Sequence, residues 1–302
     1  IDNVLNSKAH LLYTYLWLNK FFKSQKSRLN VLYEDEFYDT GRMISAANIF
    51  SYNSNVKCFG VQHGMFSEFH TVYNVSDIEI KSTSKELFNG LPIPNYFITW
   101  GQYFSKWFLK NNTLAESFIL ELGNPLFINA AYKYHPKLGK VKESDYNILY
   151  CVTSYELFVK ELPIVNEILK KMKNVFLTLR MHPNFDFEIV PDNFSNVESF
   201  SFSKYESIHT AISKTDLVLT SAHSTIFLDS IAMKVPVIRL QTVIFDSTME
   251  LNINGCITIG EFDFNEEKLK LFLLKKYRED IAKNFIFLKP ERWIKFLRES
   301  NA

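Results

Sequence analysis

The stretch Asp216-Leu-Val-Leu-Thr220-Ser221-Ala-His-Ser-Thr225 is a short apolar, β-rich run that ends in a polar turn. An amphipathic helix is predicted at 226–233 and another strand at 235–239. Strand, polar turn, helix and strand form a βαβ unit, which places its two strands in parallel. Ligands bind at the carboxyl ends of the strands in open parallel sheets. The stretch therefore predicts an α/β fold with a ligand site at this turn.

A further strand, predicted at 175–179, runs into Arg180-Met181-His182-Pro183. Because the carboxyl ends of parallel strands share one edge of a sheet, we expect Arg180 and His182 near the same turn. The hydroxyl-bearing residues of that turn are Ser221, Ser224 and Thr225. An imidazole, hydroxyls and free backbone N–H groups suit a phosphate. A lone His-Pro is also common in simple turns, and helix capping explains one of the hydroxyls, but three exceed what a cap needs.

Length and composition allow one large domain or two of ordinary size, since the chain has 302 residues of which 47% are hydrophobic and 22% charged. The net charge of +1 gives no global field that would favour nucleic acid. Cys58, Cys151 and Cys256 are far apart in strand-like runs. This spacing predicts buried thiols in a reducing, cytoplasmic compartment, with no disulfide or metal site.

Two successive strand–helix series predict two Rossmann-like halves that face each other across a cleft. Residues 129–145 are rich in Lys, Pro, Gly and charge and are the predicted linker. We expect one domain over 1–135, a second over 145–290 and a carboxyl-terminal helix at 291–302. The chain begins with Ile, and we expect the amino-terminal half to be truncated, with its first strands upstream.

Glu34-Asp35-Glu36 is the densest group of carboxylates and follows a strand predicted at 30–33. An acidic first turn on the next helix is one explanation, because the helix dipole favours it. Three adjacent carboxylates also repel one another, which makes one of them a better proton acceptor and a candidate general base. Both explanations stay open, with Glu34 or Glu36 preferred as the base.

The strand predicted at 57–61 ends in Gln62-His63-Gly64. Glycine lets the backbone approach a ligand closely, and the two polar side chains would face that ligand. An ordinary loop histidine is an equally good explanation. In the functional interpretation His63 is a second candidate base, and Gln62 and Gly64 contact an acceptor molecule.

Two more polar turns follow predicted strands, at Gly123-Asn124-Pro125 and at Thr153-Ser154. A tight turn explains the first fully, although Asn124 could also bind a sugar or phosphate. Thr153 and Ser154 are modest candidates for phosphate binding.

The chain has no GxGxxG or GxxxxGK[ST] motif, which disfavours a dinucleotide or P-loop site, and no GxSxG motif of a hydrolase. Asp229 is expected to be a solvated or capping charge.

Residues 266–298 alternate Lys and Arg with Leu, Phe and Trp. A solvated helix face is the ordinary explanation of this pattern. The alternative is a basic amphipathic surface that rests on anionic lipid, which would make the protein peripheral to a membrane. No apolar run approaches the length of a transmembrane helix.

With these motifs in place, the chain resembles the GT-B glycosyltransferases that build bacterial capsule and lipopolysaccharide. It is most similar to the group that uses CMP-activated acidic sugars, namely sialyltransferase-like and Kdo-transferase-like enzymes. The resemblance spans residues 30–240. It rests on Glu34-Asp35-Glu36, Gly60-Val-Gln-His-Gly64, Gly123-Asn-Pro125, His182-Pro183 and the Ser/Thr pair within 220–225.

The resemblance implies transfer of a sugar from a nucleotide sugar to a glycan or glycolipid acceptor, without a metal or another cofactor. The 145–290 domain would bind the donor and the 1–135 domain the acceptor, at the cytoplasmic face of the inner membrane. The predicted donor-binding residues are His182, Ser221, Ser224, Thr225, Asn124, Thr153, Ser154 and Arg180. The nucleotide is CMP, UDP or GDP. The alternatives are a teichoic-acid-type transferase of glycerol phosphate from CDP-glycerol, and a nucleotide- or sugar-binding module without turnover.

Overall fold

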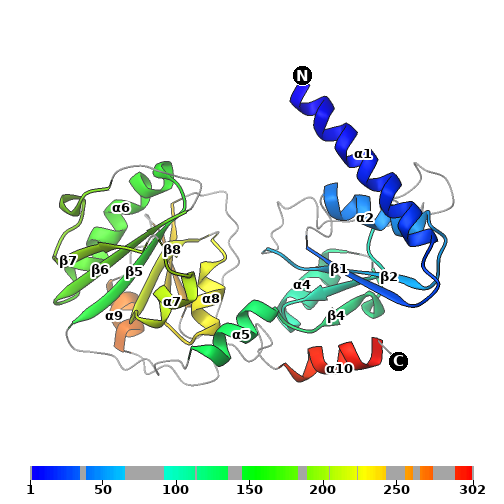
Figure 1. Cartoon of the computed structure of the whole chain (residues 1–302). Helices are drawn as coiled ribbons and strands as arrows, with labels where there is room; N and C mark the ends of the chain where they lie inside the picture. Colours follow the sequence, from blue (N-terminus) through cyan, green and yellow to red (C-terminus); the bar gives the residue numbers. More distant parts are fainter. Residues whose placement is uncertain are drawn as a thin grey trace. The chain divides into compact units, whose positions relative to one another are not determined.

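Two parallel sheets, each in its own unit, make up the computed structural model (Figure 1). The first unit comprises residues 1–124 and 284–302, and the second comprises residues 125–283. The structure describes residues 2–34, 39–64, 92–112, 114–134, 145–182, 189–203, 205–222, 224–242, 256–260, 266–274 and 290–300.

The first unit is a four-stranded sheet in which every neighbouring pair is parallel and the strands follow chain order. Its strands are β1 (Leu29–Tyr33), β2 (Val56–Val61), β3 (Tyr96–Thr99) and β4 (Ile119–Glu121). Its helices are α1 (Asp2–Lys23), α2 (Asp39–Ile49), α4 (Gln102–Asn111) and α10 (Glu291–Ser300), with a 3-10 turn at Glu116–Phe118.

Successive side chains of a strand point to opposite faces of the sheet, and both faces of this first sheet are covered by helices. On one face Phe22 of α1 and Ala47 of α2 pack around Val56 at the start of β2. On the other face Phe59 and Ile98 meet Trp293 and Phe296 of α10. A strand buried on both faces needs apolar residues at nearly every position, which is why these strands could be recognised from their sequence.

The second unit contains a six-stranded parallel sheet in the order β10-β9-β8-β5-β6-β7. The strands are β5 (Tyr146–Val152), β6 (Val175–Met181), β7 (Val197–Phe202), β8 (Leu217–Ser221), β9 (Val237–Gln241) and β10 (Cys256–Gly260). The helices are α5 (Pro125–Lys133), α6 (Tyr155–Lys170), α7 (Ile208–Ser213), α8 (Ile226–Ala232) and α9 (Glu266–Leu274), with a 3-10 turn at Pro191–Asn193.

The helices α6 and α8 cover opposite faces of the second sheet. Tyr150 of β5 donates a hydrogen bond to Glu161 of α6, which places α6 on the face of Tyr150. Arg239 of β9 lies over the ring of Phe227 of α8. Cys151 is paired with Thr220, and Thr220 with Arg239, so that Arg239 faces away from the side of Tyr150. Helices on both faces are expected when successive crossovers run in opposite directions along a parallel sheet.

The predicted α/β class with two Rossmann-like halves is confirmed, and so is the parallel pairing of the strands. The boundary between the units differs from the sequence prediction, because the first part of the expected linker is helical in α5 and residues 135–144 lie outside the described residues. The carboxyl-terminal helix α10 belongs to the first unit. Trp293 explains this placement: its Nε1 donates to the carbonyl of Gly123 at 3.0 Å, and its ring packs on the first sheet.

The three cysteines are free and buried, as their sequence context predicted. Burial raises the pKa of the Cys58, Cys151 and Cys256 thiols to about 12 in each case. Over the residues that the structure describes, no helix combines the length and the hydropathy needed to span a membrane. Residues 275–289 of the basic stretch 266–298 lie outside the described residues, and contact of this stretch with lipid stays a prediction.

Candidate functional site

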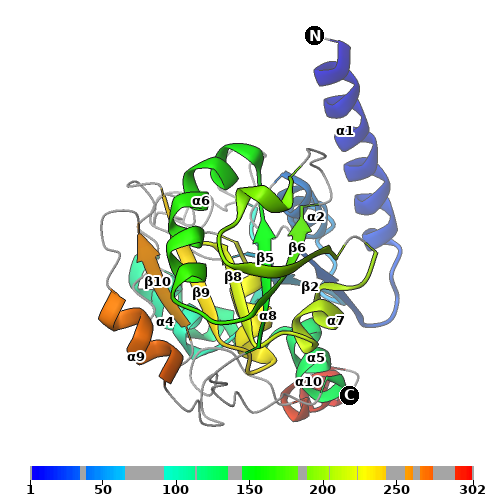
Figure 2. The ribbon, with the colours of Figure 1, turned by 90° about the vertical axis from the view of Figure 1, so that its left-hand side faces the viewer.

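The carboxyl edge of the second sheet has a switch point between β5 and β8. The first strand of this unit, β5, lies in the middle, with β6 and β7 on one side (Figure 1) and β8, β9 and β10 on the other (Figure 2). This is the strand order of the Rossmann fold. The chain leaves β5 into α6 on one face and leaves β8 into α8 on the opposite face. Ligands of open α/β sheets bind outside such a point.

The turn after β5 supplies Thr153 and Ser154. Ser154 is the N-cap of α6, and its hydroxyl accepts a hydrogen bond from the Leu157 N–H at 3.3 Å. Thr153 Oγ1 donates to Ser221 Oγ, at the end of β8, at 3.1 Å. The structure therefore joins two residues that lie 68 positions apart in the sequence and places both at the switch point. The first turn of α6 adds the positive end of a helix dipole.

The turn after β8 carries the other predicted hydroxyls. Ser221 is fully buried, Ser224 is half-buried and Thr225 is exposed. The N–H of Ser224 donates to the Ser221 carbonyl at 3.1 Å, and Ser224 Oγ accepts from the Ile226 N–H at 3.4 Å. Thr225 is the N-cap of α8 by position but makes no side-chain cap bond. His223 lies outside the described residues.

Arg239 holds the turn after β8, and no sequence pattern marks this role. This residue is only 2% exposed, and its Nε and Nη2 both donate to the Ala222 carbonyl, the former at 2.9 Å. Its Nη1 lies 3.4 Å from Thr258 Oγ1, and its guanidinium stacks over Phe227. A buried guanidinium bound to one turn fixes the turn and places a positive charge beneath it.

β6 extends two residues beyond the predicted strand, so that Arg180 lies within it and His182 directly follows it. The contacts of the two residues differ. His182 is exposed, and its backbone N–H donates to the Val152 carbonyl at 2.9 Å, next to Thr153. Arg180 Nη1 instead donates to the loop after β7, at 2.8 Å to the Glu206 carbonyl and 3.1 Å to Ser203 Oγ. Pro183 lies outside the described residues. Contact of either side chain with a donor stays a prediction.

A histidine–carboxylate pair near this edge was missed by the sequence reasoning. His209 Nε2 of α7 lies 2.8 Å from Asp229 Oδ1 of α8, and the two side chains are 18% and 14% exposed. Asp229 is therefore a partly buried partner of an imidazole, and its description as a solvated or capping charge is wrong. Tyr134 stands beside the pair, with its ring centroid 6.1 Å from that of His209. The pair joins two short helices, and a sequence without a spacing motif gives no sign of it.

In the first unit, the predicted residues lie at the carboxyl ends of β1 and β2. Glu34 follows β1 directly and is exposed, whereas Asp35 and Glu36 lie outside the described residues. Gln62 is 1% exposed, and its amide is used internally: Nε2 donates to the Gly64 carbonyl at 2.8 Å, and Oε1 accepts from the Trp100 N–H at 3.0 Å. Gln62 thus ties the ends of β2 and β3 together. The roles of Glu34, Gln62 and His63 in catalysis or acceptor binding stay predictions.

The two predicted glycine turns differ in why they hold glycine. Gly123 has a φ of 85°, a left-handed conformation that favours glycine, and it precedes Asn124 and α5. At Gly64, an added Cβ would meet nothing within 4 Å. The packing of the described residues therefore does not require glycine at position 64, and close approach of a ligand there stays a prediction.

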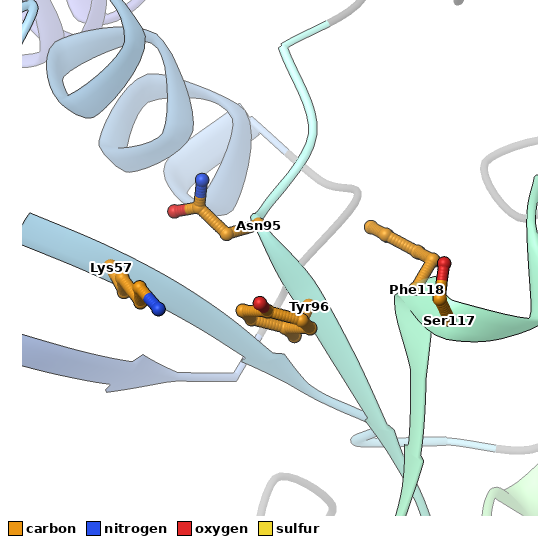
Figure 3. Close-up of a pocket in the computed structure, with 5 residues that line it drawn as sticks. All are labelled: Lys57, Asn95, Tyr96, Ser117 and Phe118. Atoms are coloured by element: carbon orange, nitrogen blue, oxygen red, sulfur yellow. The ribbon is translucent and has the colours of Figure 1, made fainter. Parts of the chain in front are cut away.

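A pocket of about 340 Å³ lies at the opposite edge of the first sheet. Figure 3 shows its five lining residues at the start of β2, the start of β3 and the 3-10 turn before β4, namely Lys57, Asn95, Tyr96, Ser117 and Phe118. Asn95 Oδ1 accepts hydrogen bonds from the Cys58 N–H and from Asn48, which gives Asn95 a structural role. The pocket lies at the amino ends of the strands, away from the edge where the predicted residues gather.

The described residues contain no group of three or more His, Cys, Asp or Glu side chains that could hold a metal ion. Hydroxyl groups, the N-terminus of α6 and His182 lie at the switch point. Such groups can donate hydrogen bonds to anions.

No protein-family model matches the sequence, and no curated protein matches it either. Solved structures do match. A putative UDP-N-acetylglucosamine 2-epimerase from Listeria monocytogenes is similar over 96% of this chain and 79% of that chain, at 15% identity and a TM-score of 0.60. The UDP-GlcNAc 2-epimerase from Neisseria meningitidis, bound to UDP-GlcNAc, is similar over 97% and 81%, at 13% identity and a TM-score of 0.61. The wall teichoic acid polymerase TagF is less similar, with a TM-score of 0.45 over 82% of this chain and 69% of that chain at 14% identity. The two epimerases show that this chain has the GT-B fold of two Rossmann-like halves.

Proposed function

We propose that the protein is a glycosyltransferase that binds a nucleotide sugar at the carboxyl edge of the second sheet. The observation that carries this proposal is the switch point between β5 and β8, where the hydroxyls of Thr153 and Ser221 meet at 3.1 Å. Ligand phosphates bind at such points because helix N-termini and backbone N–H groups converge there. The donor nucleotide is one of CMP, UDP or GDP, and an acidic sugar on CMP is the choice that the sequence motifs favour.

The residues at this edge are suited to the leaving group of such a reaction. As the bond between the anomeric carbon of the sugar and the phosphate oxygen breaks, negative charge grows on the phosphate. Ser224, Thr225 and the first turn of α6 can donate hydrogen bonds to these oxygens, and His182 is exposed beside them. Arg239 keeps the turn after β8 in place through the Ala222 carbonyl. These groups need no metal to offset the charge.

The acceptor's part of the reaction rests on the sequence of the first unit. An acceptor hydroxyl attacks the anomeric carbon of the sugar, and its proton passes to a carboxylate among Glu34, Asp35 and Glu36. Exposed Glu34 at the end of β1 supports this role, since a base must be open to its substrate. The acceptor is proposed to be a surface glycan or glycolipid, with capsule and lipopolysaccharide as the classes that the sequence motifs suggest.

Epimerisation of a nucleotide sugar is the second candidate, because the two epimerases above share the fold. It would use the same donor edge but would need no acceptor. Transfer of glycerol phosphate from CDP-glycerol is the alternative from another reaction class. The three reactions differ in what becomes of the donor. A glycosyltransferase moves the sugar to an acceptor, an epimerase inverts a centre of the sugar in place, and a glycerophosphotransferase moves glycerol phosphate from CDP-glycerol.

Ligand-observed NMR with CMP, UDP, GDP and CDP-glycerol tests the binding step. We expect saturation transfer to the ribose and base of one nucleotide, and weaker transfer in the Ser224→Ala variant. Ser201→Ala, an exposed hydroxyl on β7, is the matched control and should bind as the wild type does. Binding of CDP-glycerol alone would favour the glycerophosphotransferase, and binding of none of the four would overturn the proposal.

Turnover of the matching nucleotide sugar tests the reaction. His182→Ala should raise the transition-state free energy by about 2 to 4 kcal/mol, which lowers kcat/KM roughly 30- to 1000-fold. The control is His10→Ala, which removes an exposed imidazole from α1. A normal rate in the His182→Ala variant would contradict the phosphate contact. If the protein converts the donor to its epimer without an added acceptor, the reaction is epimerisation and not transfer.

A further inference from the structure

Glu161 is a buried carboxyl on the sheet-facing side of α6, close to the switch point. The residue is 0% exposed, and Oε2 accepts a hydrogen bond from Tyr150 Oη at 2.7 Å. Ser221 lies on the same face of the sheet as Tyr150, and its hydroxyl lowers the pKa of this carboxyl, to which it can donate a hydrogen bond. Among the described residues Oε1 completes no hydrogen bond. A buried acid is costly, and the neighbouring inward positions of α6 are apolar, so packing alone does not explain Glu161.

A chain of hydroxyls connects this carboxyl to the edge of the sheet. Ser221, the last residue of β8, acts on Glu161 from one side and accepts the hydrogen bond of Thr153 Oγ1 at 3.1 Å on the other. Thr153 is the first residue after β5 and is half-buried. A change of protonation at Glu161 can therefore reach the sheet edge through two hydroxyl groups.

The direction of these hydrogen bonds depends on the charge of Glu161, because each hydroxyl has a single proton. An ionised carboxylate only accepts, so the Ser221 proton points to Glu161 and the Thr153 proton points to Ser221. Thr153 then turns lone pairs toward a ligand. A protonated carboxyl can donate from Oε1 to Ser221 Oγ. The Ser221 proton can then turn to Thr153 Oγ1, and the Thr153 proton becomes available to a phosphate oxygen.

We propose that Glu161 is a positioning residue that sets the direction of the Ser221–Thr153 hydrogen bonds, so that a phosphate-bearing ligand binds at this edge together with a proton. The inference rests on the proposed function, since it takes the nucleotide's phosphates as the ligand. The inference adds to the proposed function a pH dependence of donor binding, which the fold alone does not require.

The surroundings of Glu161 allow both protonation states near neutral pH. Burial raises the pKa of this carboxyl to about 7, although the hydrogen bonds of Ser221 and Tyr150 oppose the rise. Burial also raises the pKa of Tyr150 well above its usual value, so that Tyr150 stays a donor. Tyr150 of β5 and Ser221 of β8 face Glu161 from the sheet, beside the apolar Ile238 and Leu240 of β9. The charged groups of α6 itself are the pairs Glu156–Lys160 and Glu167–Lys170. Cys151 of β5 and Arg239 of β9 lie on the opposite face of the sheet.

Calorimetric titration of the full chain with CMP, UDP, GDP and inorganic pyrophosphate, between pH 6 and 9, tests the inference. Two buffers with different ionisation enthalpies give the number of protons taken up at each pH. We expect wild-type binding to take up protons above pH 7, with the affinity falling as the pH rises by up to about tenfold per pH unit. The probes also titrate: a nucleotide's terminal phosphate does so near about pH 6, and pyrophosphate releases its last proton at higher pH. The deciding quantity is therefore the difference in proton uptake between the wild type and a variant with the same probe.

Glu161→Gln is the deciding variant, because the amide has nearly the same shape and cannot titrate. Its NH₂ donates to Ser221 and its carbonyl accepts from Tyr150, as in the protonated carboxyl. We expect this variant to lose the extra proton uptake and to bind the nucleotide equally well at pH 7 and pH 9. Glu156→Gln, an exposed glutamate on the same helix, should behave as the wild type does. Ser221→Ala breaks the chain with Glu161 intact and should also lose the extra uptake.

The outcomes separate this inference from the proposed function. Equal proton uptake by the wild type and the Glu161→Gln variant overturns the inference and leaves nucleotide binding untouched. Binding of pyrophosphate with Glu161-dependent uptake, but without any nucleotide, supports the inference and contradicts the donor specificity. Failure of the wild type to bind any of the three nucleotides or pyrophosphate overturns both.

Discussion

The two sheets organise their carboxyl edges differently. In the second sheet, side chains from different strands hold the turns: Thr153 bonds to Ser221, and buried Arg239 bonds to the Ala222 carbonyl. In the first sheet, the amide of Gln62 bridges backbone groups at the ends of β2 and β3, while Glu34 stays exposed. A prearranged edge suits a ligand of fixed charge and shape, and an exposed carboxylate suits proton removal from a substrate that arrives from solvent. The difference therefore supports a donor edge in the second unit and a reactive carboxylate in the first.

The largest effect that follows from this comparison is expected in the first unit. Replacing Glu34, Asp35 and Glu36 by Ala, one at a time, should lower kcat in at least one variant by about 10²- to 10⁴-fold, the usual contribution of a general base. Nucleotide binding should stay unchanged, because the donor edge belongs to the other sheet. Steady-state rates and NMR binding measured on the same samples check both parts.

Glu116→Ala is the control for these variants, since Glu116 is an exposed carboxylate at the opposite edge of the first sheet. Its rate should equal that of the wild type. If all three variants of the triplet also turn over normally, the triplet has no part in the mechanism and the acidic first turn of a helix explains it.

The strands were predictable from the sequence, because they are short apolar runs that end in polar turns. The hydroxyls of Thr153 and Ser221 were predictable for the same reason, since they directly follow or end such runs. What the sequence did not show is which charged residues are buried. Arg239 occurs in a strand with no feature that marks it, and its partner Ala222 lies 17 positions earlier. The His209–Asp229 pair depends on how two short helices pack, which no local pattern encodes.

Glu161 did leave a signal that could have been used. It stands at the spacing of the buried face of α6, between Phe158 and Val165, where the helical pattern calls for an apolar residue. A charged residue at an apolar position predicts either a break in the helix or a buried polar contact. The sequence alone does not name the contact, because Tyr150 and Ser221 belong to two different strands of the sheet.

An intermediate effect is expected when the second sheet loses the side chain that holds its turn. Arg239→Met keeps much of the length and apolar volume but leaves the buried Ala222 carbonyl without the guanidinium. We expect the free energy of unfolding to fall by about 1 to 3 kcal/mol, the cost of an unpaired buried polar group. Nucleotide affinity should fall with it, because the turn that bears Ser224 is no longer fixed. Urea denaturation and calorimetry measure the two quantities.

Arg292→Met is the matched control in the first unit. The Arg292 guanidinium donates to the Glu121 carbonyl at 2.8 Å, but its side chain is 44% exposed, so water can replace it. The change in unfolding free energy should stay within about 0.5 kcal/mol. Equal losses in both variants, or normal nucleotide binding by Arg239→Met, would mean that the second edge does not depend on its buried arginine.

The smallest effect on stability is expected at Gly64, where a substitution should affect acceptor use alone. A Cβ at this position meets nothing within 4 Å, so Gly64→Ala should leave the free energy of unfolding unchanged or raise it by up to about 1 kcal/mol. If an acceptor approaches the backbone there, the same methyl group should raise KM for the acceptor while nucleotide binding stays normal. Gly260→Ala on β10 is the control: its Cβ would come within 3.4 Å of the Gln241 carbonyl, and it should not change acceptor use. Because stability and turnover are expected to move independently at Gly64, an unaltered KM cannot be explained by damage to the fold, and it would remove the end of β2 from the acceptor site.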